Sequence, residues 1–246
     1  MKKLKALYRI FRIMILRILS RIYNNSLPHY KNILIIAPHP DDEVLGCGGL
    51  IVRQIEKGDK VSVIILTAGE ASHGGCCTIN PEILKEERIK LSKNAAKIVK
   101  LSLDNLYLLN FADGCITLND KENIDKLKRL IEEINPDAIF VTNIFEKWND
   151  HLNSARIVKE LIIEKNLDLY HYCVWIWFYM PLRKIFKINW RQARIITLSK
   201  HEMEIKDKMI TCYLEPKAPC GKAFSGELPR ILIQSAKWKK ELFFKQ

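Results

Sequence analysis

The sequence predicts an α/β protein with a mostly parallel sheet and helices on both of its faces. Two observations carry this prediction. Short apolar runs rich in Val and Ile alternate along the chain with segments of helical length and periodicity. The first two runs, residues 32–37 and 60–67, are separated by a polar turn and one helical segment, which is the pattern of a parallel crossover unit. Apolar residues make up 48% of the 246 residues, enough for a sizeable core.

The N-terminal segment, residues 1–25, carries seven Lys or Arg and no acidic residue. Arginines interrupt it too often for a membrane-spanning helix, and it lacks the cleavage site of a signal peptide. At 100° per residue one face of a helix collects Leu7, Phe11, Met14, Ile18 and Ile22, with most cations opposite. The pattern favours a helix that lies on an anionic membrane surface with its cationic side toward the headgroups. The alternative is a helix that packs on its own domain or on a partner.

The alternation of strands and helices then fills a single domain over residues 31–246. The first strand is apolar on both faces, as expected of a strand buried between two helix layers. Glycines 46, 48 and 49 at the start of the first helix predict a close approach to the sheet or to a ligand. We expect strands at 32–37, 60–67, 105–109, 137–142 and 169–178, and helices at 44–57, 81–100, 123–134 and 152–165. Residues 67–80 and 110–114 are predicted to be a loop and a turn.

Charge and cysteine content exclude several classes of protein. The formal net charge is +12, but residues 26–180 carry 18 basic and 22 acidic residues, which argues against a nucleic-acid groove in the core. The basic ends, including 186–197 and the aromatic tail 236–246, are the parts suited to an anionic surface. The seven cysteines have no CxxC spacing and predict a reducing, cytoplasmic compartment.

Polar residues follow each of the first four predicted strands. In a parallel sheet these strand ends share one edge, where ligands bind, so we expect one neighbourhood for His39, Asp41, Asp42, Glu70, Asp113, Asp150 and His151. Two histidines and one carboxylate are a known ligand composition for catalytic zinc, and a neighbouring carboxylate is then free to act as a base. The alternative for the first cluster is a capped helix start with an exposed His39. No G-x-G-x-x-G follows the first strand, which argues against a nucleotide-binding Rossmann protein.

Residues 31–215 resemble the LmbE/PIG-L family of zinc-dependent N-acetylglucosaminide deacetylases, which has a Rossmann-like fold. The sequence Pro-His-Pro-Asp-Asp-Glu at 38–43 is similar to the first family signature. Thr-Ala-Gly-Glu at 67–70 and Leu-Asn-Phe-Ala-Asp-Gly at 109–114 resemble further family turns. Asp150-His151 matches the end of a His-x-Asp-His signature, and Lys206 and Tyr213 lie in a segment similar to the family's C-terminal helix.

The resemblance implies a hydrolase that removes the N-acetyl group from an N-acetylglucosamine-type conjugate. Zinc, or another divalent metal, would be held by His39, Asp42 and His151, with Asp41 as general base. Arg88, Trp148, Asp150 and His73 would contact substrate. The conjugate could be lipid-linked, with the protein at the inner face of a membrane.

One residue departs from the family pattern. Trp148 stands where the family signature has a histidine, and an indole cannot carry a titrating proton. Either another residue such as His73 takes over that role, or the enzyme is slow, or catalysis is lost. The alternative function is therefore a catalytically impaired sugar-binding or scaffold member of the same fold.

Overall fold

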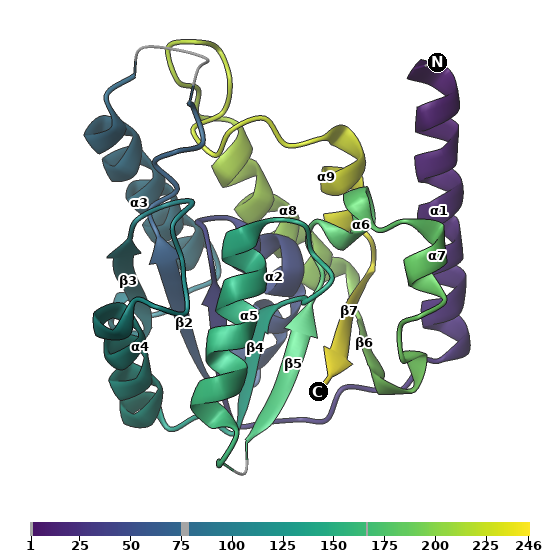
Figure 1. Ribbon diagram of the computed structural model, residues 1–246, viewed down its shortest axis with the longest axis horizontal. Coiled ribbons are helices and arrows are strands. Elements are labelled where there is room, and N and C mark those ends of the chain that lie inside the picture. Colours follow the sequence, from purple (N-terminus) through teal and green to yellow (C-terminus); the bar gives the residue numbers. More distant parts are fainter. Residues whose placement is uncertain (1, 75–78, 166) are drawn as a thin grey trace.

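The computed structural model describes residues 2–74, 79–165 and 167–246, which form one seven-stranded sheet (Figure 1). The strand order is β3-β2-β1-β4-β5-β7-β6, and the first five strands in this order are parallel. β7 runs antiparallel to both of its neighbours. The strands are β1 (Asn32–Ala37), β2 (Lys60–Thr67), β3 (Leu106–Phe111), β4 (Ala138–Thr142), β5 (Asp168–Tyr172), β6 (Ala193–Thr197) and β7 (Lys240–Lys245). The predicted α/β fold is confirmed.

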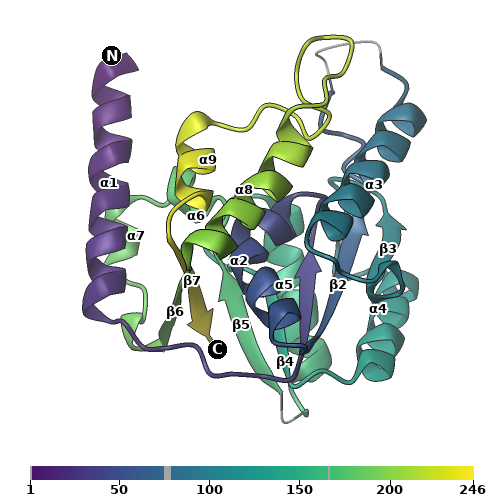
Figure 2. The same cartoon turned by 180° about the vertical axis from the view of Figure 1, so that it is seen from behind.

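Helices cover both faces of the sheet. On one face lie α2 (Asp42–Glu56), α3 (Pro81–Ile98), α8 (Lys200–Leu214) and α9 (Arg230–Ala236), and Figure 2 looks onto this side. On the other face lie α4 (Lys121–Ile134) and α5 (Asn149–Ile162). Alternate residues of β1 supply the two cores: Ile33 and Ile35 face α2, whereas Leu34 and Ile36 face α5. The buried strand β1 thus lies between the two helix layers and contributes to both cores.

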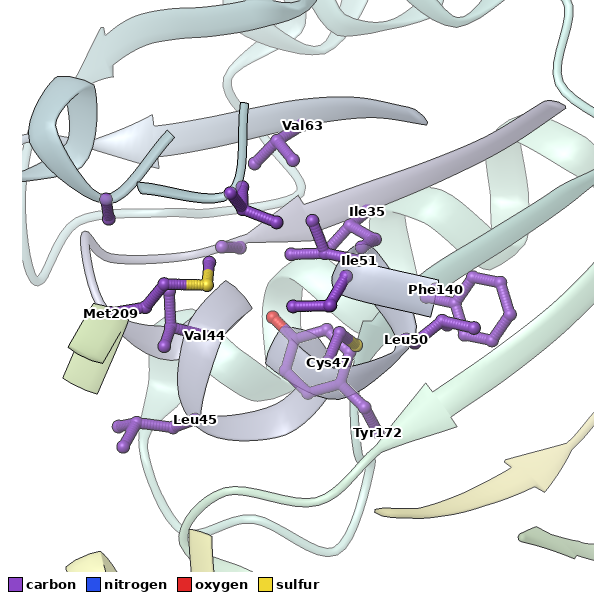
Figure 3. Close-up of a cluster of buried hydrophobic side chains, with 14 of the residues drawn as sticks. Ile35, Val44, Leu45, Cys47, Leu50, Ile51, Val63, Phe140, Tyr172 and Met209 are labelled. Carbon is purple, nitrogen blue, oxygen red and sulfur yellow. The ribbon is translucent and has the colours of Figure 1, made fainter. Parts of the chain in front are cut away.

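The start of α2 packs very closely on the sheet. A Cβ atom at Gly46 would lie 2.2 Å from the ring of Tyr172, so only glycine permits this approach. Figure 3 shows Tyr172 of β5 beside Cys47 and Leu50, which are residues of α2. The Tyr172 hydroxyl donates to the carbonyl of Ile36, 3.0 Å away. The close approach predicted from the glycines is confirmed, and it holds the β1–α2 turn rigidly at the sheet edge.

Two predictions for the last third are wrong. The strand predicted at 169–178 ends at Tyr172, and its aromatic continuation folds into the short helix α6 (Ile176–Tyr179), followed by α7 (Leu182–Ile185). The tail 236–246 is not a surface for lipid, because β7 lies inside the sheet and buries Phe243 and Phe244. The predicted loop at 67–80 includes residues 75–78, which lie outside the described residues.

The N-terminal helix α1 (Lys2–Ile22) stands at one edge of the molecule, beside α7 and beyond β6 (Figures 1 and 2). Its inner face is tied to the domain. Leu16 is fully buried in a cluster with Trp177 and Trp238. Arg12 is also buried, and its guanidinium donates to the carbonyls of Trp177 and Phe178 at 2.7 and 2.6 Å. The expectation that the cationic side of this helix faces lipid headgroups is therefore wrong for Arg12.

Candidate metal centre

Three of the predicted ligands meet at the carboxyl ends of β1 and β4. Asp42 Oδ2 lies 3.2 Å from His39 Nδ1 and 3.2 Å from His151 Nε2. His39 leaves the end of β1, Asp42 opens α2, and His151 lies in the first turn of α5. Their ligand atoms lie within 4.8 Å of one another, a separation at which one ion can contact all three. The predicted neighbourhood is confirmed for these residues.

Both histidines have their outer nitrogen held by carboxylates. Glu146 Oε2 lies 2.6 Å from His151 Nδ1, while Asp113 and Asp150 lie 3.1 and 3.2 Å from His39 Nε2. A carboxylate accepts a hydrogen bond from a protonated ring nitrogen, so with a metal bound each ring would present its other, unprotonated nitrogen on the side of Asp42. This is the arrangement of metal-ligating histidines, and the donor set fits a divalent metal such as zinc.

Glu146 is the functional residue that the sequence analysis passed over. Its side chain is completely buried, and its second oxygen accepts the backbone N–H groups of Val174, Trp175 and Ile176 at 2.6, 2.9 and 3.4 Å. It therefore joins the metal centre to the segment that starts α6. The only sequence signal was an acidic residue five positions before His151.

The charges of the centre shift its protonation equilibria. Burial lowers the pKa of His151, but Asp42 and Glu146 outweigh this and raise it to about 9. Burial likewise opposes the charge of His39, and the surrounding Asp113, Asp150 and Asp42 still raise its pKa well above the usual range. Burial raises the pKa of Asp42, but the two histidines lower it below its ordinary value. The centre therefore holds protons when no metal is bound, and metal binding must release them.

Asp41 lines the same cavity as the three candidate ligands, but it is not a member of the ligand group. It is buried, and its backbone has φ 106° and ψ −30°, a strained conformation for a residue other than glycine. Its side chain makes no capping hydrogen bond to α2, which excludes the capping alternative for this residue. Burial raises the pKa of the Asp41 carboxyl well above its usual range, Asp42 raises it further, and Arg88 opposes the shift.

A buried network holds Asp41 in its strained conformation. Glu43 Oε2 accepts the backbone N–H of Asp41 at 3.0 Å, and Glu43 Oε1 accepts the hydroxyl of Tyr213 at 2.6 Å. Tyr213 comes from α8, in the segment that resembles the family's C-terminal helix. The same segment supplies Lys206, which pairs with buried Glu241 at 2.6 Å beneath α2 rather than in the cavity.

Arg88 of α3 is buried. Its guanidinium donates to the carbonyls of Gly69 and Pro40 at 3.2 and 2.7 Å, and lies 3.7 Å from Asp41 Oδ2. A Cβ atom at Gly69 would lie 2.4 Å from the guanidinium carbon, so the glycine leaves room for this side chain. Arg88 lines the cavity beside Asp41.

The cavity over the centre has a volume of about 460 Å³. Trp148 and Trp175 form an aromatic wall, with ring centroids 5.6 Å apart and an edge-to-face angle of 69°. Trp148 is 47% exposed at the start of α5. The described lining is His39, Asp41, Asp42, Ala71, Ser72, Arg88, Asp113, Gly114, Trp148, Asn149, Asp150, His151, Trp175, Ser225 and Leu228.

The remaining predicted residues take other positions. Asp150 reaches the cavity, but its oxygens accept the N–H groups of Gly114 and Ile116 at 2.8 and 3.2 Å, so it supports His39. His73 is not among the described lining residues. Its ring is buried next to Ser72, whose Oγ lies 3.1 Å from Nδ1.

Comparisons with known proteins show what this chain is similar to. The family model described as PIG-L, GlcNAc-PI de-N-acetylase, matches residues 34–162, more than half of the chain. The chain is 26% identical over 193 residues to YaiS, an uncharacterized deacetylase of Escherichia coli (strain K12), covering 76% of this chain and 98% of that protein. It is 30% identical over 112 residues to a probable N-acetyl-α-D-glucosaminyl L-malate deacetylase 2 of Bacillus cereus, covering 44% and 50%.

Among solved structures, the fold is similar to that of the N,N′-diacetylchitobiose deacetylase from Pyrococcus horikoshii. The TM-score is 0.66 with 18% sequence identity, over 94% of this chain and 90% of that one. The matched family segment runs from within β1 to the end of α5 and therefore includes the three candidate ligand residues and Asp41. The chain therefore belongs to the PIG-L family of de-N-acetylases, which are hydrolases of an amide bond.

Proposed function

We propose that this protein is a metal-dependent N-deacetylase that hydrolyses the acetamide of an N-acetylated amino-sugar conjugate. The observation that carries the proposal is the pairing of a three-residue ligand group with a buried carboxylate, Asp41, that is not part of it. His39, Asp42 and His151 would hold the metal. When bound, zinc or another divalent metal supplies Lewis acidity, which polarises a carbonyl and makes water more acidic.

The residues of the chain have distinct roles in this proposal. Asp41 accepts the proton of the attacking water and returns it to the leaving amine, work for which a raised carboxyl pKa is suited. The cation of Arg88 lies beside Asp41 and is directed at the cavity, where it stabilises negative charge. Asp113, Asp150 and Glu146 hold the histidines in one tautomer.

The cavity supports a sugar conjugate as the substrate. Its volume of about 460 Å³ lies in the range of small-molecule sites, and it combines a polar floor with the aromatic wall of Trp148 and Trp175. The substrates named for two relatives, N-acetyl-α-D-glucosaminyl L-malate and N,N′-diacetylchitobiose, are N-acetylated sugar compounds. We therefore assign an N-acetylglucosamine-type unit to the cavity.

The carrier of this sugar is proposed to have an apolar part. Ile144, Phe145 and Trp148 are 46%, 37% and 47% exposed on the connection from β4 to α5. Exposed apolar side chains on the connection that leads into the cavity wall suit a hydrophobic aglycone or lipid.

The reaction is tested by metal analysis and by acetate release from a panel of N-acetylglucosamine conjugates with and without an alkyl chain. Wild type should bind metal and release acetate, faster from the alkyl conjugates. Asp41→Asn should keep the metal and lose acetate release, whereas the matched variant Asp125→Asn on the exposed surface of α4 should behave as wild type.

A second candidate function is supported by Trp148. The indole at the cavity rim is an aromatic platform where the related signature has a histidine, which suits binding of a sugar without turnover. If metal binds and no conjugate releases acetate, the deacetylase proposal fails. Binding of the same conjugates without turnover then identifies a sugar-binding protein.

A further inference from the structure

The outward face of α1 is apolar and uncovered in the described part of the chain. We call Leu7, Phe11, Met14, Ile18 and Ile22 the outer stripe, and their side chains are 64%, 48%, 49%, 45% and 67% exposed. The spacing of four, three, four and four residues places them on one side of the helix. A contiguous stripe of this kind on a surface helix marks a site of contact with another apolar phase.

A groove beside the stripe adds basic groups to it. It lies between α1 and α9 and has a volume of about 550 Å³. Ile10, Met14, Ile18 and Ile231 supply apolar walls. Arg17 and Arg21 are further lining residues; Arg21 is exposed, whereas the Arg17 guanidinium carbon lies 5.0 Å from the ring centroid of Trp238. The surface thus offers an apolar stripe and the Arg21 cation to the same ligand.

We propose that the outer stripe and this groove dock the protein on an anionic lipid bilayer. The stripe inserts at the level of the acyl chains, and Arg21 contacts the phosphates of lipid headgroups. Charge selects this occupant over a second copy of the chain, because Arg21 is exposed beside the stripe and residues 1–25 of a second copy hold no acidic residue that could pair with it.

The length and attachment of α1 agree with docking along a surface. None of the helices in the described ranges is long and apolar enough to cross a membrane. At 1.5 Å per residue, α1 presents a side about 30 Å long to the interface. Its inner face stays with the domain, because Arg12 caps the carbonyls of α6 and Arg9 lies 4.2 Å from the ring centroid of Phe178. The stripe is thus a feature of the folded surface.

The test is co-sedimentation of the full chain with phosphatidylcholine vesicles and with vesicles of phosphatidylcholine and phosphatidylglycerol at 3:1. Wild type should sediment with the mixed vesicles far more than with the neutral ones, and added salt should reduce the effect. A double substitution, Phe11→Glu with Ile18→Glu, should weaken the partition by about tenfold or more because it removes the inserted apolar area.

Two matched variants separate the possible causes. Ile83→Glu with Ile163→Glu makes the same chemical change at apolar residues 52% and 74% exposed, one in α3 and one directly after α5, and should bind as wild type. Phe11→Gln with Ile18→Gln removes apolar area without adding charge and should still lose most of the binding. Thermal unfolding verifies that each variant is folded.

Three outcomes overturn the proposal. In the first, wild type remains in the supernatant with anionic vesicles. In the second, the two double glutamate variants, at positions 11 and 18 and at positions 83 and 163, lose binding equally. In the third, wild type forms a dimer without lipid, the stripe variant is a monomer and neither binds vesicles, which would mean that the stripe joins two copies of the chain. None of these readouts depends on deacetylase activity.

Discussion

Replacing Glu146 by Gln should weaken metal binding while leaving the fold in place. One carboxylate oxygen accepts three backbone N–H groups at the start of α6, and the other contacts His151 Nδ1 at 2.6 Å. An amide NH₂ cannot face three donors, so the Gln oxygen must occupy the backbone side. Its NH₂ group then donates to His151 Nδ1, which shifts the ring proton to Nε2, the atom proposed to hold the metal.

The expected size of the effect follows from this change of tautomer. Loss of an outer partner of a ligating histidine weakens metal affinity by about 10- to 100-fold, which corresponds to about 1.4 to 2.7 kcal/mol. The free energy of unfolding of the metal-free protein should change much less, because the three backbone hydrogen bonds are retained. The contrast between the two quantities distinguishes orientation of His151 from general damage to the fold.

The assay is a zinc titration in competition with a chromophoric chelator, with urea unfolding of the metal-free protein alongside. Glu132→Gln is the matched control, since Glu132 is 46% exposed and pairs with Lys165 on the surface. A Glu146→Gln protein that binds zinc within about threefold of wild type, with unchanged unfolding, would refute the tautomer argument.

Three further outcomes are expected. Because neighbouring carboxylates raise the pKa of His151 to about 9, apparent metal affinity should rise between pH 6 and pH 8, by about tenfold per unit for each proton released, and a flat profile in the same titration contradicts the argument. Arg12→Met removes two charged hydrogen bonds to α6 and should lower the free energy of unfolding by about 2 to 4 kcal/mol in urea, whereas a loss below about 1 kcal/mol would show that the caps contribute little. Trp148→Ala should raise the KM for a hydrolysed conjugate by about tenfold with kcat within about threefold, since it removes binding surface, and a fall in kcat alone would give Trp148 a part in the chemistry.

Much of the site was predictable because the sheet is parallel. Strands that run in one direction bring their carboxyl ends to one edge, so His39 after β1 and His151 after β4 meet although they are far apart in sequence. Asp113 after β3 reaches the same place by the same rule. Only the order of strands and the polar residues at their ends were needed for this step.

The role of Glu146 could not be predicted, because it depends on how residues 174–176 fold. Their β-branched and aromatic side chains favour a strand, whereas the structure bends them into the turn that starts α6. Burial decides this locally, since Ile176 and Trp177 pack in the cluster that holds Leu16 of α1. Tertiary packing thus overrides the local strand propensity of these residues. The bend leaves three backbone N–H groups free of sheet pairing, and they donate to Glu146.

The two ends of the chain show that a sequence pattern can identify an apolar face without telling whether that face is buried or exposed. Both ends combine cations with aromatic and aliphatic residues, and they looked equivalent in the sequence. Tail residues Phe243 and Phe244 are buried because β7 inserts between β5 and β6, a long-range pairing with no local signal. Helical periodicity did find the stripe of α1, but only the contacts of Arg12 and Leu16 identify which side is covered.

The tryptophan at position 148 changes less of the chemistry than the departure from the family signature suggests. The rim of the cavity is an exposed place for a proton donor, and Trp148 is 47% exposed there. Asp41 is buried beside the ligand group, and its raised pKa suits a carboxyl that takes a proton and gives it back. One group can then serve both halves of the proposed reaction. In this proposal the indole supplies binding surface instead, and we expect Trp148 to affect substrate choice and Asp41 to affect turnover.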